Sequence, residues 1–371
     1  MSPTEQNPGA APVTEEAVLQ ALRAVRDPDA QQDIVTLGLV KGLVIQNGQV
    51  SFTLEFTTQP ALAKAEIHSQ ARKVVSRLAG VSEVKAAMGS TAPAAGRSAQ
   101  AGADAPRQDL IPEVKHTIAV SSGKGGVGKS TVAVNLALAL HQAGGTVGLV
   151  DVDVYGPDIP LMIGARGKPG MFEYRIIPVE SYGVKVISIG FFVAPGEAII
   201  WRGPMIHSAV QQFLKDVMWG ELDYLIFDMP PGTGDAQLSL SQVIPLSGVV
   251  MVTTPQDVAL LDVRKALAMF RKLNVPILGV VENMSDFACP HCGERTPIFG
   301  EGGGKKIAEE VGVPLLAQIP LDPETRKGGD EGRPILLRKP ESPQAAAFRE
   351  LAAAVAERVS MLSVLKLPTI A

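Results

Sequence analysis

Apolar residues recur at helical spacing over residues 18–25 and 67–78, and they alternate with polar residues over residues 50–56. The first spacing predicts two amphipathic helices, and the alternation predicts a half-buried strand. The dipeptide Asn47-Gly48 before this strand indicates a hairpin, with residues 43–45 as the partner strand.

A last strand at residues 81–88 completes the order helix, strand, strand, helix, strand. This order predicts a small α+β domain at residues 14–88, which we call the front domain. Residues 1–13 are polar and rich in Pro and Ala, and residues 89–113 are mostly Ala, Gly, Pro and Ser. Because both stretches hold few large apolar residues to offset the entropy lost on ordering, we predict a disordered tail and a flexible linker.

Residues 114–371, which we call the back domain, carry short apolar runs separated by helical patterns. Continuous apolar runs are typical of strands that are buried on both faces of a parallel sheet. The predicted strands are residues 117–121, 147–152, 184–189, 224–227, 249–253, 277–281 and 315–319. With helices at residues 259–273 and 343–360, this predicts an α/β fold with a doubly wound, mostly parallel sheet and a ligand crevice at the carboxyl ends of its strands.

A glycine-rich segment follows the first strand of the back domain. Residues 121–131 read SSGKGGVGKST, contain the pattern G-x-x-x-x-G-K-[ST] and precede a helical pattern, as in a phosphate-binding loop. The glycines let successive amides point at an anion, Lys129 supplies a charge for the β- and γ-phosphates, and Ser130 offers a hydroxyl to Mg²⁺. A glycine-rich turn without a ligand is the alternative. The predicted phosphate-binding set is Gly123, Lys124, Gly125, Gly126, Val127, Gly128, Lys129, Ser130 and Thr131.

Polar residues end three further strands. Asp151 and Asp153 stand one residue apart, so that one is placed to hold the water shell of Mg²⁺ and the other to orient an attacking water. Asp228 ends an apolar strand in a Walker B arrangement and is expected to bind Mg²⁺ through water, and residues 229–235 (MPPGTGD) form a loop suited to sense the γ-phosphate. Asn283 offers an amide to the edge of adenine. The alternative for Asp151 and Asp153 is that they are solvated acids of a loop, and the alternative for Asn283 is that it is a turn residue at the end of a strand.

The only cysteines of the chain, Cys289 and Cys292, stand in the segment Cys-Pro-His-Cys. Two thiols at this spacing can hold one metal centre, but tetrahedral zinc and cubane iron–sulfur clusters usually take four ligands. Four ligands arise if a homodimer brings two pairs together on a two-fold axis, or if His291 and an outside ligand contribute. The alternatives that stay open are a cluster between two chains, a zinc ion between two chains, a dithiol redox pair and a pair with no ligand.

Composition narrows the classes of protein. Apolar residues make up 46% and charged residues 19%, which is typical of a globular chain. The net charge of −4 disfavours a nucleic-acid partner. No apolar run reaches the roughly 18 residues that a membrane span needs. The amino terminus lacks a signal-peptide pattern. A chain with two cysteines three positions apart has no framework of structural disulfides. We therefore expect a cytoplasmic protein with no nucleic-acid or membrane partner.

The phosphate loop resembles the deviant Walker A motif of the SIMIBI ATPases, which are relatives of MinD, ParA and ArsA. In that class the early lysine, here Lys124, contacts nucleotide phosphate across a dimer interface, in the manner of an arginine finger. The second aspartate, here Asp153, activates the attacking water, and Asp151 lies near the metal. The resemblance thus implies Lys124, Lys129 and Asp153 as the catalytic residues.

Over residues 114–360 the chain resembles the Mrp/ApbC iron–sulfur cluster carrier ATPases. The resemblance implies a homodimer that binds ATP and Mg²⁺ and holds a bridging [4Fe–4S] cluster at Cys289 and Cys292. It also implies apo iron–sulfur proteins and cluster scaffold proteins as partners, with slow ATP hydrolysis as a switch. The matching segments are residues 124–131, 151–160 (DVDVYGPDIP), 201–204 (WRGP), 223–235 (DYLIFDMPPGTGD), 253–259 (TTPQDVA), 281–284 (VENM) and 289–292 (CPHC).

The front domain resembles the MIP18-type module that is often fused to such carriers. Residues 27–29 (DPD) and 33–35 (DIV) fit its opening, but the cysteine that often follows a Thr-Thr strand end is missing after Thr57-Thr58. The missing cysteine argues against a thiol-based role for the front domain, and a docking or regulatory role stays open.

Two other functions compete with cluster transfer. One is a positioning ATPase of the MinD or ParA kind that acts on membranes or DNA; for this, the tail at residues 361–368 (MLSVLKLP) is a poor membrane anchor, because it has one basic residue and a proline. The other is a zinc-bridged dimer with a regulatory ATPase.

Overall fold

The computed structural model describes residues 13–28, 30–46, 48–56, 59, 61–90, 110–193 and 203–365. These residues fall into two compact units, which contain the front domain and the back domain. Most of the predicted tail and linker lies outside the described residues, as do Asn47, Thr57-Thr58 and Trp201-Arg202.

The front domain has the predicted order of elements. Every second residue of the middle strand, from Val50 to Phe56, is buried, and these side chains form one core with Val18 and Leu22 of the first helix. The middle strand is antiparallel to β1 and parallel to β3. The elements are α1 (Glu15–Leu22), β1 (Val40–Gln46), β2 (Gln49–Phe56), α2 (Ala61–Ser76) and β3 (Glu83–Ser90).

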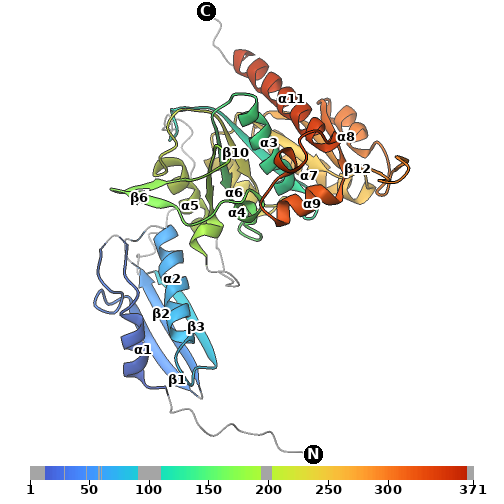
Figure 1. The fold of residues 1–371 in the computed structure, drawn as a ribbon. Helices are drawn as coiled ribbons and strands as arrows, with labels where there is room; N and C mark the ends of the chain where they lie inside the picture. The colour runs from blue at the N-terminus through green and yellow to red at the C-terminus, as the bar shows by residue number, and fades with distance from the viewer. Residues whose placement is uncertain are drawn as a thin grey trace, which may run out of the picture. The chain divides into compact units, whose positions relative to one another are not determined.

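The back domain contains all seven predicted strands in one sheet (Figure 1). They are β4 (Val114–Ser122), β5 (Val147–Asp151), β9 (Val184–Ser188), β10 (Leu222–Asp228), β11 (Gly248–Thr253), β12 (Ile277–Ala288) and β14 (Leu315–Leu321). Each pairs in parallel with its neighbours in the order β14-β12-β11-β4-β10-β5-β9. Asp228 is in register with Asp151, so the carboxyl ends of two strands bring these acids to the same edge.

Four short strands were not predicted, because each spans two or three residues and shows no periodic pattern. Two extend the sheet in the antiparallel direction, β8 beside β9 and β13 beside β12, and two form a separate hairpin. Their bounds are β6 (Gly170–Phe172), β7 (Arg175–Ile177), β8 (Val179–Ser181) and β13 (Arg295–Thr296).

The predicted end of one strand at Asn283 was wrong, because β12 continues to Ala288. Met284 has a φ of 56°, which is the left-handed region, and the pairing of β12 with β14 shifts register after Asn283. The strand therefore bends without ending, and its extension carries the chain to the cysteine pair.

Helices cover both faces of the sheet, since every residue of β5 and β11 is buried. Two of the longest, α3 and α11, pack against each other, and α5–α6 and α7–α8 form two further pairs (Figure 1). The bounds are α3 (Lys129–Gln142), α4 (Ile159–Met162), a 3-10 turn (Ile189–Phe192), α5 (Gly203–Lys215), α6 (Asp235–Val243), α7 (Asp257–Lys272), α8 (Gly303–Val311), α9 (Pro323–Asp330), α10 (Ile335–Arg338) and α11 (Pro343–Leu365). Both predicted helices, at residues 259–273 and 343–360, are confirmed as α7 and α11.

Candidate functional site

The phosphate loop lies between the end of β4 at Ser122 and the start of α3 at Lys129. It is held on two sides: a Cβ at Gly123 would lie 2.4 Å from the backbone carbon of Asp262 on α7, and one at Gly128 would lie 2.2 Å from Nδ2 of Asn283. Gly128 also has a φ of 83°, which favours glycine. The close approach of α7 and β12 therefore explains why glycine stands at both ends of the loop.

Four predicted site residues meet at the start of α3. The Lys129 ammonium lies 2.6 Å from Oδ1 of Asp228 and 3.3 Å from Oδ2 of Asp153. Oγ of Ser130 donates a 2.6 Å hydrogen bond to Oδ2 of Asp228. Lys129 and Asp228 are buried, so the lysine is neutralised by the carboxylate at the end of β10 and by that of Asp153 in the loop after β5.

Asp151 lies next to this cluster and is fully buried. Its carboxylate accepts hydrogen bonds from Oγ of Ser188 at 2.8 Å and from the backbone N–H groups of Asp153 at 3.2 Å and Ile159 at 3.4 Å. It therefore shapes the loop that carries Asp153.

Burial and the neighbouring charges both shift the pKa values of the groups in this cluster. Burial raises the pKa of Asp151 well above its usual value, and the charge of Asp228 raises it further. Burial also raises the pKa of Asp228, although Lys129 and Ser130 oppose it. Burial alone would lower the pKa of Lys129, but the charges of Asp228 and Asp153 outweigh it and raise that pKa. The lysine is thus held as a cation.

The donor set fits a magnesium ion. The hydroxyl of Ser130 and the carboxylates of Asp228 and Asp151 are oxygen ligands, which Mg²⁺ prefers, directly or through water. Three buried carboxylates stand against one ammonium, and burial, with a smaller contribution from the neighbouring carboxylates, raises the pKa values of Asp151 and Asp228. A divalent cation would offset the excess negative charge.

The loop after Asp228 is bonded to the strand that leads into the phosphate loop. The N–H of Met229 donates to the carbonyl of Val120 at 3.1 Å, and the N–H of Gly232 donates to the carbonyl of Ser122 at 2.9 Å. Gln237, a buried residue of α6, donates from Nε2 to Oγ of Ser121. Sequence reasoning missed Gln237, because a glutamine inside a helical pattern gives no local sign that it is buried.

Asn283 and Thr131 line a cavity of about 380 Å³ beside the phosphate loop. Nδ2 of Asn283 donates a 2.8 Å hydrogen bond to the carbonyl of Val127, so the amide braces the phosphate loop. Its predicted contact with adenine stays a prediction. The cavity is also lined by Asp158, Leu161, Met162, Met284, Ile319, Pro320, Leu321, Asp322, Thr325, Arg326, Gly329 and Asp330.

The cysteine pair lies at the tip of a hairpin made by β12 and β13, which we call the cysteine hairpin (residues 287–296). The N–H of Cys289 donates to the carbonyl of Glu294 at 2.9 Å, and the N–H of Gly293 donates to the carbonyl of Cys289 at 2.8 Å. Hydrogen bonds from the backbone of Cys292 and His291 lower the pKa of Cys289, which favours the thiolate. Cys292 is exposed and Cys289 partly exposed. Within the described part of the chain, no three His, Cys, Asp or Glu side chains gather as a metal site.

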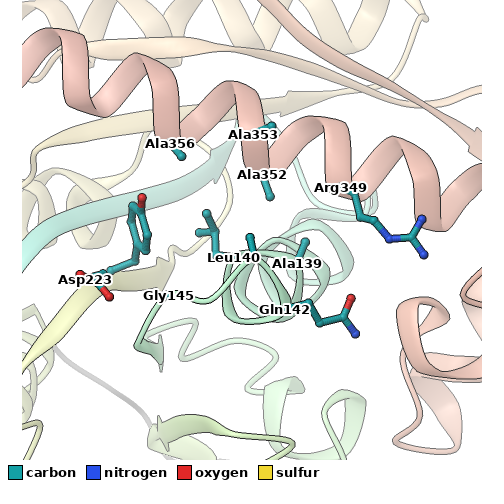
Figure 2. A pocket seen from close by; sticks show the side chains of 11 residues that line it. Ala139, Leu140, Gln142, Gly145, Asp223, Arg349, Ala352, Ala353 and Ala356 are labelled. Carbon is teal, nitrogen blue, oxygen red and sulfur yellow. The ribbon is translucent and has the colours of Figure 1, made fainter.

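A second cavity, of about 540 Å³, lies between α3 and α11 and is lined by Ala139 and Leu140 of α3 and by Ala352 and Ala356 of α11 (Figure 2). Its charged groups are already paired: Asp223 accepts from Lys115 and Thr146, and Arg349 donates to a backbone carbonyl. Asp223 also stands at the amino-terminal end of β10, whereas the site residues gather at the carboxyl ends. This cavity is therefore separate from the nucleotide pocket.

The parallel sheet and the loop between β4 and α3 define a P-loop NTPase. Its phosphate loop carries an additional early lysine, Lys124. A family model described as NUBPL iron-transfer P-loop NTPase matches residues 113–356, and one described as iron–sulfur cluster assembly protein matches residues 15–86. The first match covers more than half of the chain, so the chain belongs to the iron-transfer P-loop NTPases of the ParA group, as its motifs predicted.

One relative matches nearly the whole chain, and two others match about two thirds of it. An iron–sulfur cluster carrier protein of Synechocystis sp. is 45% identical over 361 residues, which is 94% of this chain and 99% of that one. The iron–sulfur cluster transfer protein NUBPL of Mus musculus is 49% identical over 257 residues, 68% of this chain and 81% of that one. A nucleotide-binding protein of Archaeoglobus fulgidus, solved in complex with ADP, is 39% identical with a TM-score of 0.57, covering 64% of this chain and 94% of that chain.

None of the helices in the described part of the chain combines the length and the apolar character that crossing a membrane requires.

Proposed function

We propose that the chain is an ATP-dependent carrier that holds a [4Fe–4S] cluster between the cysteine hairpins of two copies and delivers it to apo iron–sulfur proteins. The observation that carries the proposal is the placement of the thiols. Cys289 and Cys292 lie at the tip of a hairpin, open to solvent, directly after the strand whose Asn283 braces the phosphate loop.

The number of ligands supports a homodimer. The chain has two cysteines in all, and a cubane cluster usually takes four thiolates. Two hairpins that meet on a two-fold axis supply four, and a solvent-facing tip leaves room for the second copy. Val258 and Leu261 on α7 are 65% and 57% exposed beside the point where α7 touches Gly123, and a second copy would cover them.

The nucleotide pocket supplies the switch. The amides of the phosphate loop and Lys129 would bind the β- and γ-phosphates, and Ser130, Asp228 and Asp151 would hold Mg²⁺ directly or through water. Because Lys129 is already paired with Asp228, nucleotide must exchange that partner for phosphate. Asp153 would orient the attacking water, and Lys124 would reach the phosphates of the partner subunit's nucleotide.

Anaerobic reconstitution with iron and sulfide tests the proposal. The wild-type dimer should bind about two iron and two sulfide atoms per chain, as one cubane cluster between two copies. Cys289→Ala should lose the cluster and keep ATP binding, and Asp153→Asn should do the reverse, keeping the cluster and losing hydrolysis. An unchanged iron and sulfide content in Cys289→Ala contradicts the proposal, and stoichiometric zinc in the reconstituted wild type would assign the pair to a zinc-bridged dimer.

A further inference from the structure

Glu282 is a buried carboxylate that the proposed chemistry does not use. It lies on β12 directly before Asn283 and is 1% exposed. One carboxylate oxygen accepts a hydrogen bond from the N–H of Gly304, and the other accepts one from Nε2 of Gln318 at 2.7 Å. A buried carboxylate is costly unless such bonds are made, so these partners hold the side chain in one position.

The contact with Gly304 fixes the start of α8, the helix that follows the cysteine hairpin. A Cβ at Gly304 would lie 2.6 Å from Cβ of Glu282, and one at Gly303 would lie 2.2 Å from the carbonyl oxygen of Pro255. Gly302 caps this helix without a side-chain hydrogen bond, so the Glu282 carboxylate supplies the negative charge that a helix start favours. The start of α8 is thereby packed against Glu282 of β12 and against Pro255, which follows β11.

The next residue of the same strand touches the nucleotide site. Asn283 donates to the carbonyl of Val127, and Met284 after it has a left-handed φ of 56°. Strained backbone of this kind persists where surrounding contacts over-determine it. Because Glu282 and Asn283 are joined by one peptide unit, a displacement of the phosphate loop carried by Asn283 acts on Glu282 as well.

We infer that Glu282 is a positioning residue that links the phosphate loop to the cysteine hairpin. The cysteine hairpin begins on β12, and the chain after it continues into α8. Glu282 of β12 accepts a hydrogen bond from Gly304 of α8 and so joins the two elements that flank the hairpin. Nucleotide binding then changes the environment of Cys289 and Cys292 through Asn283, Glu282 and Gly304. The inference rests on the proposed function for its purpose, since it supplies the route by which nucleotide would control the cluster.

The rate of thiol alkylation measures this link directly, because the two cysteines of the chain both lie in the hairpin. The metal-free full-length protein is treated with iodoacetamide, with and without Mg²⁺ and a nonhydrolysable ATP analogue. Coupling between sites typically changes an equilibrium about fivefold or more, so the wild-type rates should differ by at least that factor. Glu282→Gln removes the negative charge at the start of α8 and replaces charged hydrogen bonds by weaker neutral ones, so the rates should agree within about twofold.

Two further variants complete the test: one is a control on α8, and the other removes a hydrogen-bond partner of Glu282. Glu310→Gln removes a carboxylate from the same helix, where it pairs with Arg264 on the surface, and should retain the wild-type ratio of rates. Gln318→Ala removes a partner of Glu282 from an exposed position and should reduce the ratio, even if Glu282→Gln fails to fold.

Equal rates with and without the analogue in the wild type would overturn the inference, as would a full ratio in Glu282→Gln or a loss of affinity for the analogue in that variant. The iron and sulfide content of the reconstituted wild type is measured separately. A protein that binds no cluster but loses its rate ratio in Glu282→Gln would refute the proposed function and leave this link in place.

Discussion

Replacing Lys129 by methionine should destabilise the back domain before any nucleotide is added. The side chain is 6% exposed, and its ammonium lies 2.6 Å and 3.3 Å from the carboxylates of Asp228 and Asp153. Removing one partner of a buried ion pair costs about 3–5 kcal/mol, because the remaining charges stay buried without compensation. For a domain of this size each kcal/mol lowers the midpoint temperature by about 2–4 °C, which gives roughly 6–20 °C.

The stability that Lys129→Met loses relative to wild type should depend on pH. Burial already raises the pKa of Asp228, and the loss of Lys129 raises it further. An acid whose pKa is raised in the folded state stabilises the folded domain at low pH, and this contribution is lost as pH rises through that pKa. The deficit of Lys129→Met relative to wild type should therefore be larger at pH 8 than at pH 5. Adding Asp153→Asn removes one of the uncompensated carboxylates and should restore part of the stability.

Urea unfolding followed by tryptophan fluorescence measures this deficit. Neither of the two tryptophans falls within residues 14–88 of the sequence, and Trp219 is a buried residue of the back domain, so its fluorescence reports the unfolding of that domain. Lys115→Met is the matched control, since Lys115 is 71% exposed and exposed ion pairs contribute little to stability. A Lys129→Met protein as stable as wild type at pH 8, or with the same deficit at pH 5, would refute the electrostatic reasoning.

Three further outcomes are expected. Asp153→Asn should slow hydrolysis by about 100-fold or more, as the loss of a general base does, while equilibrium binding of ATP is retained; phosphate release in a single turnover measures the rate, and a wild-type rate would exclude the role. Gly128→Ala should abolish ATP binding in a titration, because its Cβ would lie 2.2 Å from Nδ2 of Asn283 at a φ of 83°, and Asn283→Ala added to it should recover part of the affinity; no recovery would count against the steric cause. Hydrogen bonds from Lys115 and Thr146 lower the pKa of Asp223 to about 2, so its stabilisation is present above the unfolded pKa near 3.8 and is lost as pH falls through about 2. Asp223→Asn should thus cost about 1 kcal/mol at pH 7, after a reduction for solvent screening, and the difference from wild type in urea unfolding should narrow below pH 4; a difference that does not change with pH would argue against this ion pair.

The phosphate loop and its carboxylates were predictable because each carries a local signature. The spacing of Gly128, Lys129 and Ser130 identifies the loop, and an acid at the end of an apolar run identifies Asp228. Parallel strands bring their carboxyl ends to one edge, so a correct reading of the strands also placed these residues together. The structure confirms this for Lys129, Ser130, Asp153 and Asp228.

The roles of the buried polar residues were not predictable in the same way. Gln237 bonds with Ser121 across 116 positions, and Asn283 bonds with Val127 across 156. Neither pairing leaves a trace in the local pattern, because it depends on the register and packing of elements that are distant in the chain. The extension of β12 to Ala288 was missed for a related reason, since Met284 interrupts the local regularity and β13 and β14 complete the pairing.

The two domains, the parallel sheet, the phosphate loop and the pair of thiols were predictable, because apolar periodicity and short-range spacing encode each of them. Contacts between distant segments place the thiols on the tip of a β-hairpin, and they let Glu282 hold α8 while Asn283 braces the phosphate loop. The physical reason is that a buried polar side chain takes whichever partner the packed chain brings within bonding distance, and that partner is set by contacts between distant segments.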